Sequence, residues 1–264
     1  MMRDEIPMRD RILDKLTQNG QETWISGEAL SREFGISRAA VSKHVMSLRE
    51  EGHIIESVPR RGYRFISRAD PWAGDDVREG LRTTVLGQTE WIWLKETGST
   101  NQVAALKAMQ GAPEGLVVVA RRQNEGRGSN GHRWLNLPGS LCFSVITKPH
   151  LPPERLKELP RLAMEAVAEA VKKSCALELE QRPPNDLFLN GRKVVGILAE
   201  SMFHNTVLQW SVVGIGVNVN VPSDAIVPEL ADIASSLYAE TGTAFSVTRL
   251  LRHILEELET RLEN

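Results

Sequence analysis

A glycine-rich stretch at residues 123–134 is the first candidate for a ligand-binding loop. It reads QNEGRGSNGHRW, and Gly126, Gly128 and Gly131 match the G-x-G-x-x-G spacing of dinucleotide-binding loops. That fingerprint requires a helix directly after the glycines, because the helix N-terminus meets the pyrophosphate. Here a Pro-Gly turn and an alternating β-branched run at 140–147 follow, which predicts a strand. We therefore exclude NAD binding and expect a loop between two strands whose backbone amides approach an anion.

Four other short motifs combine polar side chains with glycine or proline. They are Ser-Thr-Asn at 99–101, Pro-Pro-Asn-Asp at 183–186, Gly-Arg-Lys at 191–193 and Gly-Ile-Gly-Val-Asn at 214–218. Taken singly, each has a structural explanation as a helix cap, a turn, a hairpin or a strand end. The sequence has no Walker A motif, no closely spaced metal-binding histidines or cysteines, and no G-x-S-x-G elbow.

Composition limits the class of protein. The chain has 264 residues and a formal net charge of −2, which excludes a globally basic nucleic-acid binder and allows a local basic patch. No apolar run approaches the roughly 20 residues that span a bilayer, and no secretory signal is recognisable, so we expect no membrane partner. We expect Cys142 and Cys175 to be reduced core residues of a cytoplasmic protein.

The N-terminal quarter of the chain predicts a winged helix-turn-helix. Ser26 and Gly35 are the cap and the stop of one helix, and Ser37 and Gly52 delimit a second. Two short helices joined by a tight turn with glycine form a helix-turn-helix. The run at 53–67 then predicts two strands around a turn, which is the wing.

This module predicts DNA binding. The second helix presents Arg38, Ser42 and Lys43 outward, and the wing tip carries Arg60 and Arg61. Between Ser37 and Arg68, seven lysines and arginines stand against three glutamates. A helical bundle that contacts proteins is the alternative. Because one module offers few phosphate contacts, we expect a homodimer on a two-fold operator site.

A polar linker at 69–78 separates this domain, 1–68, from a second domain at 79–264. In the second domain strands and helices mix without strict βαβ alternation, which predicts an α+β fold on a mostly antiparallel sheet. The predicted strands cover 91–95, 116–123, 140–147, 177–182, 186–190, 193–201 and 207–220. One predicted helix begins at Thr100, which we expect to be its cap. Three further helices are predicted at 158–173, 232–240 and 247–259.

In their order and spacing, the motifs resemble those of the biotin protein ligase family. S-T-N, Q-x-x-G-R-G-x-x-G-x-x-W, P-N-D-L, G-R-K-x-x-G-I-L-x-E and G-I-G-V-N-V-N follow one another over about half of the chain. The winged helix-turn-helix in front resembles the bifunctional members, which also repress biotin operons. The resemblance implies formation of biotinyl-AMP from biotin and ATP with Mg²⁺, and transfer to a biotin carboxyl carrier protein domain. The alternative is a repressor that senses biotin or biotinyl-AMP without transferring it.

The resemblance also implies residue roles. Lys193 would contact the biotin carboxyl and the phosphoryl oxygens, and Arg127 would steady the reactive carboxylate, because charge develops on these oxygens. Loop amides around 126–128 would hold the phosphate. The implied biotin contacts are Ser99, Thr100, Asn101, Gln123, Gly126, Arg127, Gly128, Ser129, Lys193, Gly196 and Leu198. The implied nucleotide contacts are Gly131, His132, Trp134, Asn185, Asp186 and Asn218, with Trp134 stacked on adenine and Asp186 as the Mg²⁺ ligand.

The sequence departs from the usual family pattern in three places. Two arginines of the family loop are Ser129 and His132 here, and the Lys-Trp pair before Pro-Asn-Asp is Arg182-Pro183. Arginine keeps the cation of lysine but changes the geometry of its donors. The small C-terminal β-barrel of the family has no counterpart before Asn264, so we expect a protein without it.

Overall fold

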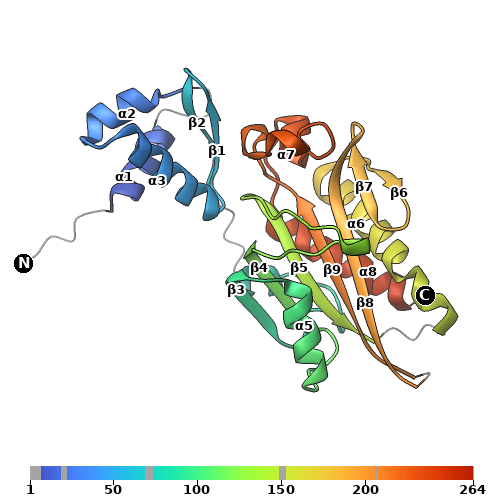
Figure 1. Ribbon diagram of the computed structural model, residues 1–264. Coiled ribbons are helices and arrows are strands. Elements are labelled where there is room, and N and C mark those ends of the chain that lie inside the picture. Colours follow the sequence, from blue (N-terminus) through green and yellow to red (C-terminus); the bar gives the residue numbers. More distant parts are fainter. Residues whose placement is uncertain (1–6, 19–22, 69–73, 149–152, 206, 264) are drawn as a thin grey trace, which may run out of the picture.

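Figure 1 shows the computed structural model, which describes residues 7–18, 23–68, 74–148, 153–205 and 207–263. A helical unit with a β-hairpin comes first in the chain and is followed by a larger unit built on a sheet. The first part of the predicted linker, 69–73, lies outside the described residues. Within the described residues, no helix combines the length and the apolar character that a membrane crossing requires.

The N-terminal domain is the predicted winged helix-turn-helix. Its elements are α1 (Met8–Gln18), α2 (Gly27–Phe34), α3 (Arg38–Glu50), β1 (Ile54–Val58) and β2 (Gly62–Ser67). The Ser26 and Ser37 hydroxyls accept hydrogen bonds from main-chain amides in the first turns of α2 and α3, at 3.0 and 3.1 Å. Gly35 ends α2 in the left-handed region, with φ of 66°. These caps fix the angle between the two helices, and a small apolar core holds them against the hairpin.

The second domain is built on a seven-stranded mixed sheet. Its strand order is β3-β4-β5-β9-β8-β7-β6, and every neighbouring pair is antiparallel except β3 and β4. The strands are β3 (Trp91–Thr97), β4 (Val117–Gln123), β5 (Ser140–Thr147), β6 (Glu180–Arg182), β7 (Asp186–Leu189), β8 (Arg192–His204) and β9 (Val207–Asn218). The α+β prediction is therefore confirmed, and the glycine loop joins two antiparallel strands.

Helices cover both faces of the sheet (Figure 1). On one face, α6 (Leu159–Cys175) and α8 (Val247–Glu263) pack together over the main apolar core. On the other face, α5 (Thr100–Met109) crosses from β3 to β4 and packs on β4, β5 and β9. The first turn of α5 thereby lies over the centre of the sheet, where the glycine-rich strands run side by side.

Four details differ from the expectations. The end of the predicted linker is a helix, α4 (Gly74–Arg78), and Val77 lies in the core of the second domain. The cap of α5 is Ser99, because Thr100 directs its amide and hydroxyl to Gln123. Only β6 remains of the predicted strand at 177–182. The predicted helix at 232–240 is reduced to α7 (Leu237–Thr241), because the backbone just before it pairs with β8 instead.

Candidate functional site

The predicted site residues meet in a cavity on the sheet face that carries α5. The cavity has a volume of about 110 Å³ and lies between the start of α5, the glycine loop and strands β7, β8 and β9. Its lining includes Ser99, Thr100, Asn101, Gln123, Arg127, Gly128, Ser129, His132, Trp134, Asn185, Asp186, Lys193, Gly196 and Leu198. Gly126, Gly131 and Asn218 are not part of this lining.

A buried polar network forms one end of the cavity. The amide and the hydroxyl of Thr100 both donate to Gln123 Oε1, at 2.7 and 3.1 Å. The hydroxyl of Ser144, which is fully buried, lies 2.7 Å from Thr100 Oγ1 and 2.6 Å from Asn101 Oδ1. Asn101 Nδ2 in turn donates to Glu200 Oε2 at 2.8 Å. Fixed donors and acceptors in an apolar surrounding suit a small ligand that carries both N–H and C=O groups.

Ser144 was missed by the sequence reasoning, although a signal for it exists. It is a hydroxyl in the middle of a strand in which every residue is buried. A buried polar group requires a partner, so a serine at this position indicates a polar neighbour across the sheet face. That neighbour is the first turn of α5.

A strip of glycines forms the floor of the cavity. Gly196 of β8 pairs with Gly216 of β9, and Gly214 lies two residues earlier on the same face. A Cβ atom at Gly216 would lie 2.5 Å from the indole of Trp134, and one at Gly196 would lie 2.7 Å from it. A Cβ atom at Gly214 would lie 1.9 Å from Asn101 Oδ1. The glycines therefore allow an indole and an amide to lie directly on the strand backbones.

The glycine loop folds back on itself. The amide of Gly128 donates to His132 O at 2.8 Å, and that of Trp134 donates to Gly126 O at 2.9 Å. Asn185 Nδ2 donates to Ser129 Oγ at 2.9 Å, which ties the loop to the start of β7. The serine that replaces a family arginine therefore holds the loop by a neutral hydrogen bond. The Gly128 amide is one of those predicted to hold phosphate. In this conformation it donates to the carbonyl of His132 in the same loop.

Two cations lie at the other end of the cavity. Lys193 Nζ is 2.6 Å from Asp186 Oδ1, and the two side chains are 33% and 28% exposed. Arg127 is exposed on the glycine loop at the rim. The main chain of Lys193 is fixed as well, because its amide donates to Ile233 O at 2.8 Å and its carbonyl accepts from the amide of Ser235 at 2.9 Å.

Asn218 supports this arrangement from behind. Its Nδ2 donates to Ser235 O at 2.9 Å, and its Oδ1 accepts from the Ser140 hydroxyl at 3.1 Å. Asn218 is 5% exposed, and its buried side chain holds the segment that flanks Lys193. The segment 233–235 itself was predicted to be helical, and its pairing with Lys193 is visible only in the structure.

The Cys142 thiol, which lies next to the cavity, is not activated for nucleophilic attack. Burial raises the pKa of the Cys142 thiol, which lies against Trp134 and Gln123, to about 12, so the thiol stays protonated at neutral pH. No cluster of three or more metal-binding side chains occurs in the part of the chain that the structure describes. Two cations, hydrogen-bond donors and a small polar pocket suit a reaction in which charge develops on oxygen atoms.

The N-terminal domain presents the predicted DNA-binding side chains to solvent. Arg38 and Lys43 are exposed on α3, and Ser42 is half-buried beside them. Arg60 and Arg61 are exposed at the tip of the wing. The guanidinium of Arg61 lies 4.6 Å from the ring centroid of Trp24, a cation–π contact that orients it.

Comparisons with known proteins identify a family for each of the two domains. The profile of the biotin/lipoate A/B protein ligase family matches residues 93–218, and an HTH domain profile matches residues 9–64. The bifunctional ligase/repressor BirA of Bacillus spizizenii is 36% identical over 255 residues, which cover 96% of this chain and 78% of the relative. The protein of the same name from Bacillus subtilis is 35% identical with the same coverage.

Solved structures agree with this assignment. A biotin protein ligase from Aquifex aeolicus in complex with biotin and ATP is 31% identical, with a TM-score of 0.55 over 66% of this chain and 70% of that one. A biotin protein ligase from Leishmania major in complex with biotinyl-5-AMP is 26% identical, with a TM-score of 0.52 over 64% of this chain and 73% of that one. Because the Bacillus relatives match nearly the whole chain, through both domains, the chain belongs to the bifunctional ligase/repressor family.

Proposed function

We propose that this bifunctional biotin protein ligase and repressor forms biotinyl-AMP in the cavity between α5 and the glycine loop. The observation that carries the proposal is the meeting of five motifs, far apart in sequence, around Lys193 and the buried Thr100–Gln123 network. The product is then transferred to a lysine of a biotin carboxyl carrier protein domain, and the liganded protein represses transcription.

The chemistry needs charge stabilisation more than a protein nucleophile. A carboxylate oxygen of biotin attacks the α-phosphorus of ATP, and the bond to pyrophosphate breaks. The acceptor amine then attacks the acyl carbon, AMP leaves with the electron pair, and the amine loses a proton. Lys193 is half-buried beside Asp186, so its ammonium can shift by a rotamer change to the phosphoryl oxygens, and Arg127 can close from the rim onto the biotin carboxylate.

The polar network is the proposed site for the ureido ring of biotin. Thr100, Gln123, Asn101 and Ser144 supply the donors and acceptors that a cyclic urea requires. The cavity of about 110 Å³ is smaller than the roughly 300–1,000 Å³ of common ligand pockets. Because the indole of Trp134 lies on the glycine floor, we expect biotin to displace it, after which the ring is free to stack on adenine.

ATP is expected to bring Mg²⁺ to the site. The only carboxylate among the predicted nucleotide contacts is Asp186, and it is paired with Lys193. This donor set fits a Mg²⁺ ion that is held mainly by phosphate oxygens and water, with Asp186 as one protein ligand once Lys193 has moved to the phosphates. When bound, the ion neutralises phosphate charge.

The N-terminal domain is the proposed operator-binding module, which acts in a homodimer. The exposed cations of α3 and the wing tip support this assignment. The ATP requirement and the two free cysteines, Cys142 and Cys175, agree with the cytoplasmic location that we also propose.

Pyrophosphate release with biotin and ATP tests the proposed enzyme activity. We expect release that requires both substrates, and turnover only when a biotin carboxyl carrier domain is added and becomes labelled. A single burst of pyrophosphate with no labelled acceptor would contradict the transfer step and favour a sensing repressor. The absence of any burst would contradict the adenylation site.

Replacing Arg60 and Arg61 together with alanine tests the wing. Because both should contact phosphates, we expect weaker binding to all duplexes and a salt slope that falls by about one unit per lost contact. A control variant with alanine at Arg161 and Lys172, exposed cations of the ligase domain, removes the same charge and should bind DNA normally. A loss confined to one sequence, with an unchanged salt slope, would instead indicate base readout by the wing.

A further inference from the structure

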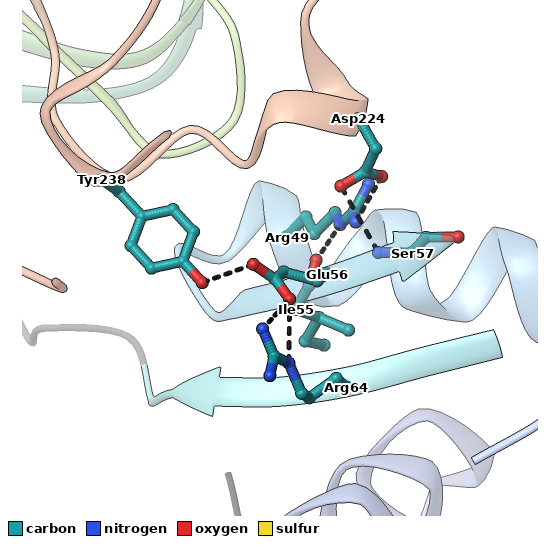
Figure 2. A network of polar contacts seen from close by, with 7 residues as sticks. All are labelled: Arg49, Ile55, Glu56, Ser57, Arg64, Asp224 and Tyr238. Atoms are coloured by element: carbon teal, nitrogen blue, oxygen red, sulfur yellow. Dashed lines mark hydrogen bonds and ion pairs between the residues drawn. The ribbon is translucent and has the colours of Figure 1, made fainter. Parts of the chain in front are cut away.

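Two side chains of the ligase domain contact strand β1 of the wing (Figure 2). The hydroxyl of Tyr238, at the start of α7, donates to Glu56 Oε1 at 2.7 Å. Asp224 lies in the short helix η3 (Ser223–Ala225), where it accepts from Arg49 of α3 at 2.7 Å and from the amide of Ser57 at 3.3 Å. The side chains of Arg49 and Asp224 are only 11% and 26% exposed. These contacts join the ligase domain to β1 and to the end of α3.

The contact with Tyr238 continues through the wing. Glu56 Oε2 accepts from Arg64 Nε at 2.9 Å and from its terminal nitrogen at 2.5 Å, across the β1–β2 pair. The guanidinium of Arg64 lies 5.0 Å from the ring centroid of Trp24, the same ring that Arg61 contacts. Glu56 therefore fixes Arg64, and Arg64 shares its aromatic support with Arg61 at the wing tip.

The other end of this connection is the adenylation site. The amide of Tyr238 donates to Val219 O at 2.9 Å, one residue after Asn218. Ser235 lies three residues before Tyr238. Its carbonyl accepts from Asn218 Nδ2, and its amide donates to Lys193 O. The segment from which Tyr238 projects is thus bonded both to the main chain of Lys193 and to the side chain of Asn218.

From this chain of contacts we infer that Tyr238 is a positioning residue for the DNA-binding wing. The inference rests on the proposed repressor function and names the route by which the ligand site acts on it. Tyr238 holds Glu56, Glu56 holds Arg64, and the Arg64–Trp24 pair keeps Arg61 in the orientation that contacts a phosphate. Asp224 is the second anchor of the same strand.

Tyr238→Phe removes only the hydroxyl and is the direct test. The probe is a duplex enriched from a random-sequence pool by the wild-type protein with biotin and ATP. We expect the variant to bind it about threefold to tenfold more weakly in the presence of biotin and ATP, as for one lost hydrogen bond of ordinary net strength. The salt slope should fall by about one unit, since the contact of Arg61 is lost. Pyrophosphate release should be unchanged.

Thr241→Val is the matched control, because the Thr241 hydroxyl lies one turn further along α7, where it donates to Leu237 O at 2.7 Å and accepts from the amide of Thr243 at 3.1 Å, both within the ligase domain. It should bind the duplex like the wild type. Neither variant touches the other contacts between the domains, in which Asp224 accepts from Arg49 and Ser57 and Arg121 of β4 donates to Glu51 O at 3.0 Å. A positioning role moves the salt slope, whereas a loss of folded protein lowers the active fraction and leaves the slope unchanged.

Glu56→Gln tests the relay from the wing side and does not depend on the folding of the ligase domain. If the relay is correct, it weakens binding by a similar factor, and the double variant with Tyr238→Phe is no weaker than either single one. Additive losses, an unchanged affinity and salt slope in Tyr238→Phe, or a fall in its pyrophosphate release would each overturn the inference. A wild-type protein that fails to bind any duplex would contradict the repressor function instead.

Discussion

Lys193→Ala is expected to slow pyrophosphate release from biotin and ATP by about 100- to 1,000-fold, while biotin still binds. The variant lacks one preorganised positive charge beside the oxygen atoms that become more negative in the transition state. The main-chain hydrogen bonds of residue 193 to Ile233 and Ser235 do not involve its side chain, so the surrounding backbone should persist. The Thr100–Gln123 network proposed for the ureido ring does not include Lys193, which is why affinity for biotin should be retained.

The control for this variant is Lys172→Ala, which removes an exposed lysine that is paired with Glu178. Its rate should equal that of the wild type. Rapid-quench measurement of pyrophosphate, together with equilibrium dialysis of biotin, separates chemistry from binding. A Lys193→Ala protein that releases pyrophosphate within a factor of three of the wild type would contradict the assignment.

Gly216→Ala is expected to raise the KM for biotin by about tenfold to a hundredfold, with a smaller change in kcat. The new Cβ atom would lie 2.5 Å from the present position of the Trp134 indole, and biotin needs the same space once it has displaced the ring, so the methyl group overpacks the biotin-bound site. Cores respond to such overpacking by shifts that cost about 1–3 kcal/mol. A shift of that size corresponds to roughly one to two powers of ten in affinity when it falls on the binding site.

Gly98→Ala provides the comparison, because it lies just before the Ser-Thr-Asn motif and its new Cβ atom would meet no atom closer than 3.4 Å. It should bind biotin normally. In a Trp134→Phe background, Gly216→Ala should raise KM by the same factor, because the methyl group meets biotin and not the displaced ring. A Gly216→Ala protein with wild-type KM, or a loss that disappears in the Trp134→Phe background, would show that the floor is not where biotin binds.

Local features of the fold could be predicted from the sequence because their causes are local. Ser26, Ser37 and Gly35 cap and stop the helices at which they were placed, since each acts on amides and carbonyls within one turn. The order of the motifs indicated the family, which the comparison with the Bacillus relatives confirms. The glycine loop also lies between two strands, as the alternating run after it predicted.

The remaining features depend on partners that are distant in the sequence. The segment 233–235 has the composition of a helix, but its backbone pairs with Lys193, about forty residues earlier, and that pairing decides its conformation. Val77 lies in a stretch that predicts a linker, but in the structure it belongs to the apolar core, where α4 contacts α8. Ser144, Asp224 and Tyr238 carry no motif, and their roles follow only from contacts across the sheet or between the domains. The residue roles inferred from the family pattern stay predictions until variants are measured.

The central claim is that one ligand site controls one DNA-binding module in the same chain. Its most direct test is the affinity for the enriched duplex, measured with biotin alone, with ATP alone and with both, for the wild type and for Lys193→Ala. We predict that only the two substrates together tighten binding by the wild type, that the Lys193→Ala protein does not respond to them, and that added biotinyl-AMP restores much of the response. Equal affinity of the wild type in all conditions, or a full response of Lys193→Ala to biotin and ATP, would contradict the account.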